Sequence, residues 1–258
     1  MHISYSELKT WAECTWRHKL EYLDKLKIFK GNEYTSFGKA LHSVGEKFVL
    51  EESSDISPEE YFETQFLNEL KDLSINDKEI SFDEKLVSDM RKQGTTLSTK
   101  IIPGLEEYFD TFEVISVEEK LYENIDNSDL KFKGFIDLVV KKDHMYYILD
   151  WKTCSWGWRS DKKRDQLTTY QLTLYKHYFA KKHNIDPKNI KTCFGLLKRT
   201  AKKNHVEIFE VSSGPKKTEN ALNLLKKALY NIEKKRFIKN KLSCQYCPFN
   251  DKPELCKK

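Results

Sequence analysis

Two neighbouring stretches, Gly134-Phe-Ile-Asp-Leu-Val-Val140 and Met145-Tyr-Tyr-Ile-Leu-Asp-Trp-Lys152, decide the fold of this chain. Both are short, apolar and rich in β-branched and aromatic residues, which is typical of strands, and Asp143-His144 between them favours a tight turn. Because side chains alternate along a strand, Asp150 and Lys152 are expected to share one face. The sequence therefore predicts a hairpin that brings acids and a lysine together beside a sheet.

The two acids of this hairpin, Asp137 and Asp150, each interrupt an otherwise apolar run. A hairpin with ordinary surface charges is one interpretation, since an Asp-x-Lys triplet is common. Acids are seldom buried without partners, however, and a divalent cation bound by both carboxylates would be such a partner. Lys152 would then act on a water molecule or a phosphate.

Further polar residues lie before and after this hairpin in the chain. His42 lies in Phe37-Gly-Lys-Ala-Leu-His-Ser-Val-Gly-Glu46, and Gln171 and Tyr175 are spaced i and i+4, so that both face one side of a helix. Together with Gly134-Phe-Ile-Asp and Asp-Trp-Lys152, this order and spacing resembles the PD-(D/E)XK nucleases. Within them it is similar to the RecB-like branch, which includes CRISPR-associated adaptation nucleases and phage or bacterial RecB-like exonucleases. The resemblance extends from about Ser4 to the C-terminus.

The resemblance implies a role for each of these residues. Catalytic roles fall to Asp137, Asp150, Lys152, Gln171 and Tyr175. Mg²⁺ or Mn²⁺ would be bound by His42, Asp137, Asp150 and the carbonyl of Trp151, and a histidine ligand favours Mn²⁺ somewhat. Taken without the resemblance, His42 is better interpreted as a buried or capped helix histidine. Gln166 and Tyr170 repeat the Gln-x-x-x-Tyr spacing, and we prefer the later pair because relatives continue with Leu-x-Leu-Tyr and an aromatic helix.

Six cysteines indicate metal or redox chemistry rather than a disulfide framework. Many RecB-like nucleases hold a [4Fe-4S] cluster with one N-terminal and three C-terminal cysteines, and the resemblance assigns these roles to Cys14, Cys244, Cys247 and Cys256. The gap between Cys247 and Cys256 is longer than is usual in the family. Four thiolates also bind Zn²⁺, so zinc is the alternative. Cys154 and Cys193 are expected to be small core residues.

A segment that combines tryptophans with basic residues follows Lys152 directly. Interleaved aromatic and basic side chains are what a stacking platform for single-stranded bases needs. The alternative is that the tryptophans pack against the start of the next helix. The expected DNA-binding residues are Trp156, Trp158, Arg159, Lys162, Lys163 and Arg164.

The resemblance implies an α/β fold with a restriction-endonuclease-like core. A mixed central sheet would be flanked by helices, with a helical insertion and a cysteine-rich C-terminal tail. We expect a single domain over 1–258. Its expected parts are the N-terminal helices (1–56), the helical insertion (57–112), the catalytic core (113–211), and the C-terminal helix with the cysteine cluster (212–258).

Cap residues and apolar spacing predict the individual elements. Glu119, on the first expected strand, would share a face with apolar neighbours, and would either support the site or pair with a lysine. The expected helices cover about 4–23, 36–52, 164–184 and 215–237, the first strand covers 113–122, and a hairpin covers 190–200 and 206–211.

The composition is compatible with these expectations but does not by itself support them. The net charge is only +5, which does not by itself announce nucleic-acid binding, although basic residues cluster at 159–164 and 198–203. The chain has no signal peptide pattern and no long apolar run, so we expect a soluble cytoplasmic protein without a membrane segment.

Together with these residues, the resemblance implies a divalent-metal-dependent deoxyribonuclease, an exonuclease acting on single-stranded DNA or DNA ends. Its biological setting would be DNA repair, recombination or replication, with partner proteins in such a complex. A non-catalytic DNA-binding module is the alternative from another class. A structure-selective endonuclease is the alternative among enzymes.

Overall fold

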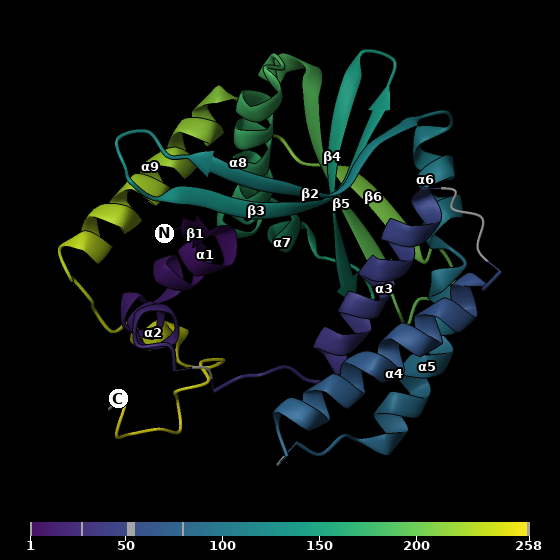
Figure 1. The fold of residues 1–258 in the computed structure, drawn as a ribbon, viewed down its shortest axis with the longest axis horizontal. Coiled ribbons are helices and arrows are strands. Elements are labelled where there is room, and N and C mark those ends of the chain that lie inside the picture. The colour runs from purple at the N-terminus through teal and green to yellow at the C-terminus, as the bar shows by residue number, and fades with distance from the viewer. Residues whose placement is uncertain (1, 27, 51–54, 79, 257–258) are drawn as a thin grey trace. The chain divides into compact units, whose positions relative to one another are not determined.

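The structure is a computed structural model that describes residues 2–26, 28–50, 55–78 and 80–256 (Figure 1). It divides into two compact units, each built from separated segments of the chain. Unit 1 comprises Met1–Phe29, Leu121–Gly134 and Gly214–Lys258, and unit 2 comprises Lys30–Lys120 and Phe135–Ser213. The single domain that we expected over 1–258 stays a prediction.

Unit 2 contains a mixed sheet. Its strands β3, β4, β5 and β6 are hydrogen-bonded neighbours in that order, and β2 pairs with β3. The contacts are antiparallel between β3 and β4, parallel between β4 and β5, and antiparallel between β5 and β6. Both expected hairpins are therefore present. The strand bounds are Glu113–Asn124 (β2), Lys131–Lys142 (β3), Met145–Cys154 (β4), Ile190–Lys198 (β5) and Val206–Glu210 (β6).

Helices of unit 2 cover both faces of this sheet. Leu149 and Trp151 of β4 join one core with side chains from α3, α4, α5 and α6, whereas α8 packs against β4 and β5. Residue 150 lies between the two core residues, so it points to the face that α8 covers. The bounds are Glu33–Val49 (α3), Pro58–Asn76 (α4), Glu84–Ser98 (α5), Ile101–Phe109 (α6), Ser160–Arg164 (α7) and Gln166–His183 (α8).

The segment expected as a helical insertion, 57–112, is helical, and Figure 1 shows α4 and α5 beside α3. Phe62, Leu97 and Leu105 are fully buried in the same core as Leu149. These helices therefore contribute side chains to the core of unit 2, and their origin as an insertion stays a prediction. A mixed sheet flanked by helices is what the sequence predicted.

Unit 1 departs from the expected N-terminal helix. β1 (His2–Ser4) pairs in parallel with residues 131–133 and was not expected. α1 (Tyr5–Glu13) starts at the expected cap Ser4 but ends at Cys14, whose extended φ of −161° interrupts the helix. The chain continues as α2 (Thr15–His18) and a π-helical turn (Lys19–Leu23). The long C-terminal helix of unit 1, α9, covers Pro215–Glu233.

Other helix boundaries differ from the expected ones because the helices are capped by residues that we did not expect. Asn32 and Thr35 form a capping box, so α3 begins before the expected residue 36. The expected end of this helix at residue 52 lies outside the described residues. Asp165 caps α8, so the helix expected over 164–184 is divided between α7 and α8. In the part of the chain that the structure describes, no helix has the length and apolar character needed to cross a bilayer.

Gly195 of β5 makes room for the indole of Trp151 on the neighbouring strand. A Cβ atom at Gly195 would lie 2.3 Å from Cε3 of Trp151. We expect Gly195→Ala to lower the free energy of unfolding by about 1–3 kcal/mol, because the overpacked indole must shift. Urea denaturation measures this loss.

Gly38→Ala is the matched control, since a Cβ there would make its nearest contact at 3.4 Å, with Thr153 Oγ1. Equal stability of the two variants would contradict the close packing at Gly195.

Candidate active site

Asp137 and Asp150 lie beside the Leu138–Leu149 pair of β3 and β4, and both are almost completely buried. The pairing places them on one face of the hairpin. Oδ2 of Asp137 accepts a 2.6 Å hydrogen bond from the backbone N–H of Trp151. The local backbone therefore holds the first carboxylate against the strand that carries the second.

Two basic side chains contact these acids. Lys152 forms an ion pair with Oδ2 of Asp150, and Nδ1 of His42, from α3, lies 3.4 Å from Oδ2 of Asp137. Burial disfavours the charged forms of both bases, but the neighbouring carboxylates outweigh burial and raise the pKa of His42 and of Lys152. Lys152 is accordingly held as a cation.

The two carboxyl groups titrate differently although they are neighbours. Burial raises the pKa of Asp150 to about 6, despite the opposing effect of Lys152. Burial by itself would raise the pKa of Asp137 as well. His42, Lys152 and the Trp151 N–H outweigh it, and together they bring the pKa of Asp137 below its usual value. The site therefore separates one firmly ionised carboxylate from one that gains a proton more easily.

Helix α8 fixes the orientation of Asp150. Nε2 of Gln171 donates a 2.6 Å hydrogen bond to Oδ1 of Asp150, and the same group lies 3.2 Å from Oη of Tyr175. Tyr175 is buried, and burial raises its pKa, so it remains a phenol. The structure thus brings together His42, Asp137, Asp150, Lys152, Gln171 and Tyr175 as predicted, whereas their chemical roles stay predictions.

Sequence reasoning missed a second pair of acids, Glu46 and Glu118. Glu46 follows His42 by one helical turn, which is the spacing that could have revealed it. Burial and the hydrogen-bonded Glu118 carboxyl raise the pKa of Glu46 to about 7, and burial likewise raises the pKa of Glu118. Since both carboxyls interact electrostatically with His42 and Asp137, this pair extends the acidic site.

A backbone irregularity in β2 explains why Glu118 rather than Glu119 faces this cluster. Glu118 has a φ of +50°, in the left-handed region that interrupts strand alternation. Glu119 instead pairs with His183 at 2.9 Å and with Lys182. Of the two alternatives for Glu119, pairing with a lysine is the one observed.

The donor set suits a hard divalent cation. Carboxylate oxygens and one imidazole are ligands that Mg²⁺ and Mn²⁺ accept, and four carboxyl groups outnumber the neighbouring bases Lys152 and His42. Within the described ranges, no three His, Cys, Asp or Glu side chains are arranged closely enough to hold a metal ion. In this arrangement Lys152 neutralises Asp150, and the ligand role of the Trp151 carbonyl stays a prediction.

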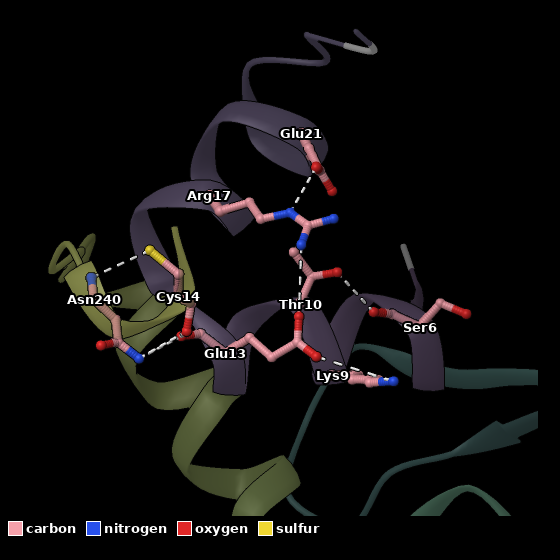
Figure 2. Close-up of polar contacts among 9 residues, drawn as sticks. Ser6, Lys9, Thr10, Glu13, Cys14, Arg17, Glu21 and Asn240 are labelled. Atoms are coloured by element: carbon pink, nitrogen blue, oxygen red, sulfur yellow. Dashed lines mark hydrogen bonds and ion pairs between the residues drawn. The ribbon is translucent and has the colours of Figure 1, made fainter. Parts of the chain in front are cut away.

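The predicted cluster cysteines come together in unit 1. Cys14, Cys244, Cys247 and Cys256 line one cavity. Figure 2 shows Asn240 beside Cys14: its backbone N–H donates to Sγ of Cys14 at 3.4 Å, and its side chain donates to the carbonyl of Glu13 at 2.8 Å. Segments more than 220 residues apart are therefore joined through hydrogen bonds around these thiols.

The other two cysteines lie in unit 2. Cys193 is fully buried on β5, where burial raises its pKa to about 12, and Cys154 is half-buried at the end of β4. All six cysteines are described, and they form no disulfide with one another.

The predicted DNA-binding residues divide into two groups. Trp158 packs edge-on against Phe194 and Phe209, and Lys163 pairs with Glu207. These two side chains belong to the packing of the sheet. Trp156, Arg159, Lys162 and Arg164 are exposed.

Comparison with known proteins finds one matching family and two solved structures. The chain matches the family model of the PD-(D/E)XK nuclease superfamily over residues 2–252. A crystal structure from Eubacterium rectale, named as a presumed exonuclease, covers 96% of this chain and 88% of its own length, with 14% identity and a TM-score of 0.61. The structure of SSO0001 covers 87% of this chain and 97% of its own, with 14% identity and a TM-score of 0.39, too low to support an argument. No curated protein matches the chain.

The raised pKa of Glu46 predicts a pH-dependent stability in the absence of metal. Because the native pKa of about 7 exceeds the ordinary value of 4.5, the native state binds more protons than the unfolded state between these values. Stability is therefore lost as the pH rises through 7. We expect Glu46→Gln to flatten the fall in melting temperature between pH 5.5 and pH 8 in EDTA.

Glu119→Gln is the opposite control, because Lys182 and His183 outweigh burial and lower the pKa of Glu119. It should reduce stability most at neutral pH. Parallel pH curves for Glu46→Gln and the unmodified protein would show that Glu46 has no raised pKa.

Proposed function

Because the chain belongs to the PD-(D/E)XK nuclease superfamily, we propose that it is a divalent-metal-dependent deoxyribonuclease of the RecB-like branch, acting as an exonuclease on single-stranded DNA or DNA ends. One observation carries this proposal. Two buried carboxylates, Asp137 and Asp150, lie together with Lys152 and are oriented by a backbone N–H and by Gln171. Such a concentration of buried charge is costly for folding and suits phosphodiester hydrolysis.

Asp137, Asp150, His42 and the Trp151 carbonyl are the groups that would hold Mg²⁺ or Mn²⁺. When bound, the cation neutralises negative charge on the phosphate and lowers the pKa of a water molecule. Lys152 stays protonated beside the cleaved phosphate and donates to an oxygen on which negative charge develops. Gln171 fixes the direction of the Asp150 carboxyl, and Tyr175 lies within reach of the Gln171 amide.

The alternatives differ in what they require of these residues. A non-catalytic DNA-binding module has no need for the costly buried pair of Asp150 and Lys152, so the intact site favours an enzyme. A structure-selective endonuclease would use the same site on another substrate. DNA is the substrate in each case, and partner proteins of a recombination or replication complex remain part of the proposal.

A [4Fe-4S] cluster in the cavity of unit 1 is the second part of the proposal. Four thiols that line one cavity have the donor chemistry of such a cluster, although the described residues do not place three of them closely enough to hold a metal ion; Zn²⁺ is the alternative. Burial and the neighbouring thiols Cys14 and Cys244 raise the pKa of Cys247, so a bound cation there would compensate clustered thiolates.

The nuclease proposal predicts that Lys152→Ala and Asp150→Asn each lower the rate of DNA degradation by at least about 100-fold, because charge stabilisation at the phosphate is lost. Degradation of end-labelled single- and double-stranded DNA with Mn²⁺ or Mg²⁺ measures the effect, and the products distinguish end-wise from internal cleavage. Lys191→Ala is the control, since this lysine forms a surface pair with Glu210. Parental activity of either site variant would contradict the proposal.

The cluster proposal predicts iron and sulfide in the anaerobically purified protein, with broad visible absorbance. Cys247→Ser should remove most of the iron, whereas Cys193→Ser should retain it, because Cys193 is buried in unit 2. Metal analysis provides the measurement. Stoichiometric zinc without iron would establish the alternative, and retention of all metal by Cys247→Ser would contradict both.

A further inference from the structure

We infer that Trp156 is a stacking platform for a base of single-stranded DNA next to the candidate active site, and that Trp158 has no part in it. This inference rests on the proposed function and specifies how the substrate would be held. Trp156 is 74% exposed, whereas Trp158 contacts Phe194 and Phe209. A lone exposed tryptophan requires no explanation by itself, so the surroundings of Trp156 carry the argument.

The backbone before Trp156 is fixed by the turn between β5 and β6. The carbonyl of Ser155 accepts hydrogen bonds from the Thr200 backbone N–H at 3.1 Å and from Oγ1 of Thr200 at 2.7 Å. Arg199 donates through its backbone N–H to the carbonyl of Cys154 at 2.9 Å and through its guanidinium to Oγ of Ser155 at 3.2 Å. The residue that carries the exposed indole therefore starts from a well-held position.

The backbone after Trp156 is restricted as well. Gly157 has a φ of +119°, a conformation that residues with a side chain rarely adopt, and a Cβ there would lie 3.3 Å from Lys198. Beyond it, the Trp158 ring is held against the sheet. An exposed aromatic ring on a restrained backbone loses little conformational entropy when a base stacks on it.

Arg199 is itself held in place. Its guanidinium donates to Oε1 of Gln93 in α5 at 2.8 Å and lies over the Tyr34 ring at 5.3 Å. The Arg199 side chain that hydrogen-bonds to Ser155 is therefore also held by helices α5 and α3 of the same unit. This arrangement distinguishes Trp156 from an exposed side chain on an unsupported loop.

Charge around Trp156 favours a nucleic acid. Exposed cations flank the segment on both sides, with Arg159 and Lys162 following it and Lys202 and Lys203 on the bracing β5–β6 turn. Such cations attract phosphates of either DNA form, but only a single strand offers unpaired base faces to a protruding indole. The occupant that fits is single-stranded DNA.

Trp156 lies close to the candidate catalytic residue Lys152 in the chain. Trp156 follows Lys152 by four residues, so their Cα atoms are at most about 14 Å apart. A base stacked on Trp156 would belong to a nucleotide close to the cleaved phosphate. The platform would therefore favour single strands over duplexes by holding the strand beside Lys152.

The test compares Trp156→Leu with Trp156→Phe, which keeps an aromatic face. Binding of matched single- and double-stranded oligonucleotides is titrated in EDTA, so that binding is measured apart from cleavage. We expect Trp156→Leu to weaken single-strand binding by about fivefold to 150-fold, the range of one lost base stack, and Trp156→Phe to lose much less. Duplex binding should change little for either variant, and the melting temperature should stay the same.

Intrinsic fluorescence gives a second measurement. Single-stranded DNA should quench tryptophan emission of the parental protein, and Trp156→Phe should remove most of this quenching although four tryptophans remain. Arg159→Gln is the charge control, and it should lower the affinity for single-stranded and double-stranded DNA to the same extent. Unchanged single-strand affinity of Trp156→Leu, or equal losses on single strands and duplexes, would overturn the inference.

Cleavage assays separate this inference from the proposed function. With Mn²⁺, Trp156→Leu should raise the KM for single-stranded DNA and leave kcat nearly unchanged, because the metal-binding residues are untouched. A parental protein that binds but does not cleave DNA would contradict the proposed function, while the binding comparison would still decide the role of Trp156.

Discussion

Burial of two carboxylates side by side is the constraint on which the rest of the site depends. Asp137 and Asp150 occupy positions in a hairpin where apolar residues would be more stable, and each has partners that offset its burial. The partners come from the hairpin backbone, from α3 and from α8. Positioning these helices around the sheet is therefore also what makes two buried acids tolerable.

Much of this arrangement could be predicted from the sequence because it depends on local periodicity. Strand alternation places Asp150 and Lys152 on one face, and helical spacing aligns Gln171 with Tyr175. That these segments meet could not be obtained from periodicity; it followed from the family resemblance. The mixed sheet flanked by helices agrees with the fold that the resemblance implies.

What the sequence did not predict depends on tertiary partners or on unusual backbone. No turn residue marks the positive φ of Glu118, so simple alternation selected Glu119 instead. The break at Cys14 occurs within a segment of good helical pattern. Trp156 and Trp158 have the same chemistry in the same segment, and only the aromatic neighbours of Trp158 on the sheet tell them apart.

The contact between Gly195 and the Trp151 indole has a consequence for how this sequence can vary. Trp151 lies between Asp150 and Lys152 in the chain, so its large ring lies on the face of β4 opposite to the charged pair. A side chain at position 195 destabilises the protein unless the residue at position 151 is smaller. The two positions should therefore covary among relatives, linking a residue without a side chain to the chemistry on the opposite face.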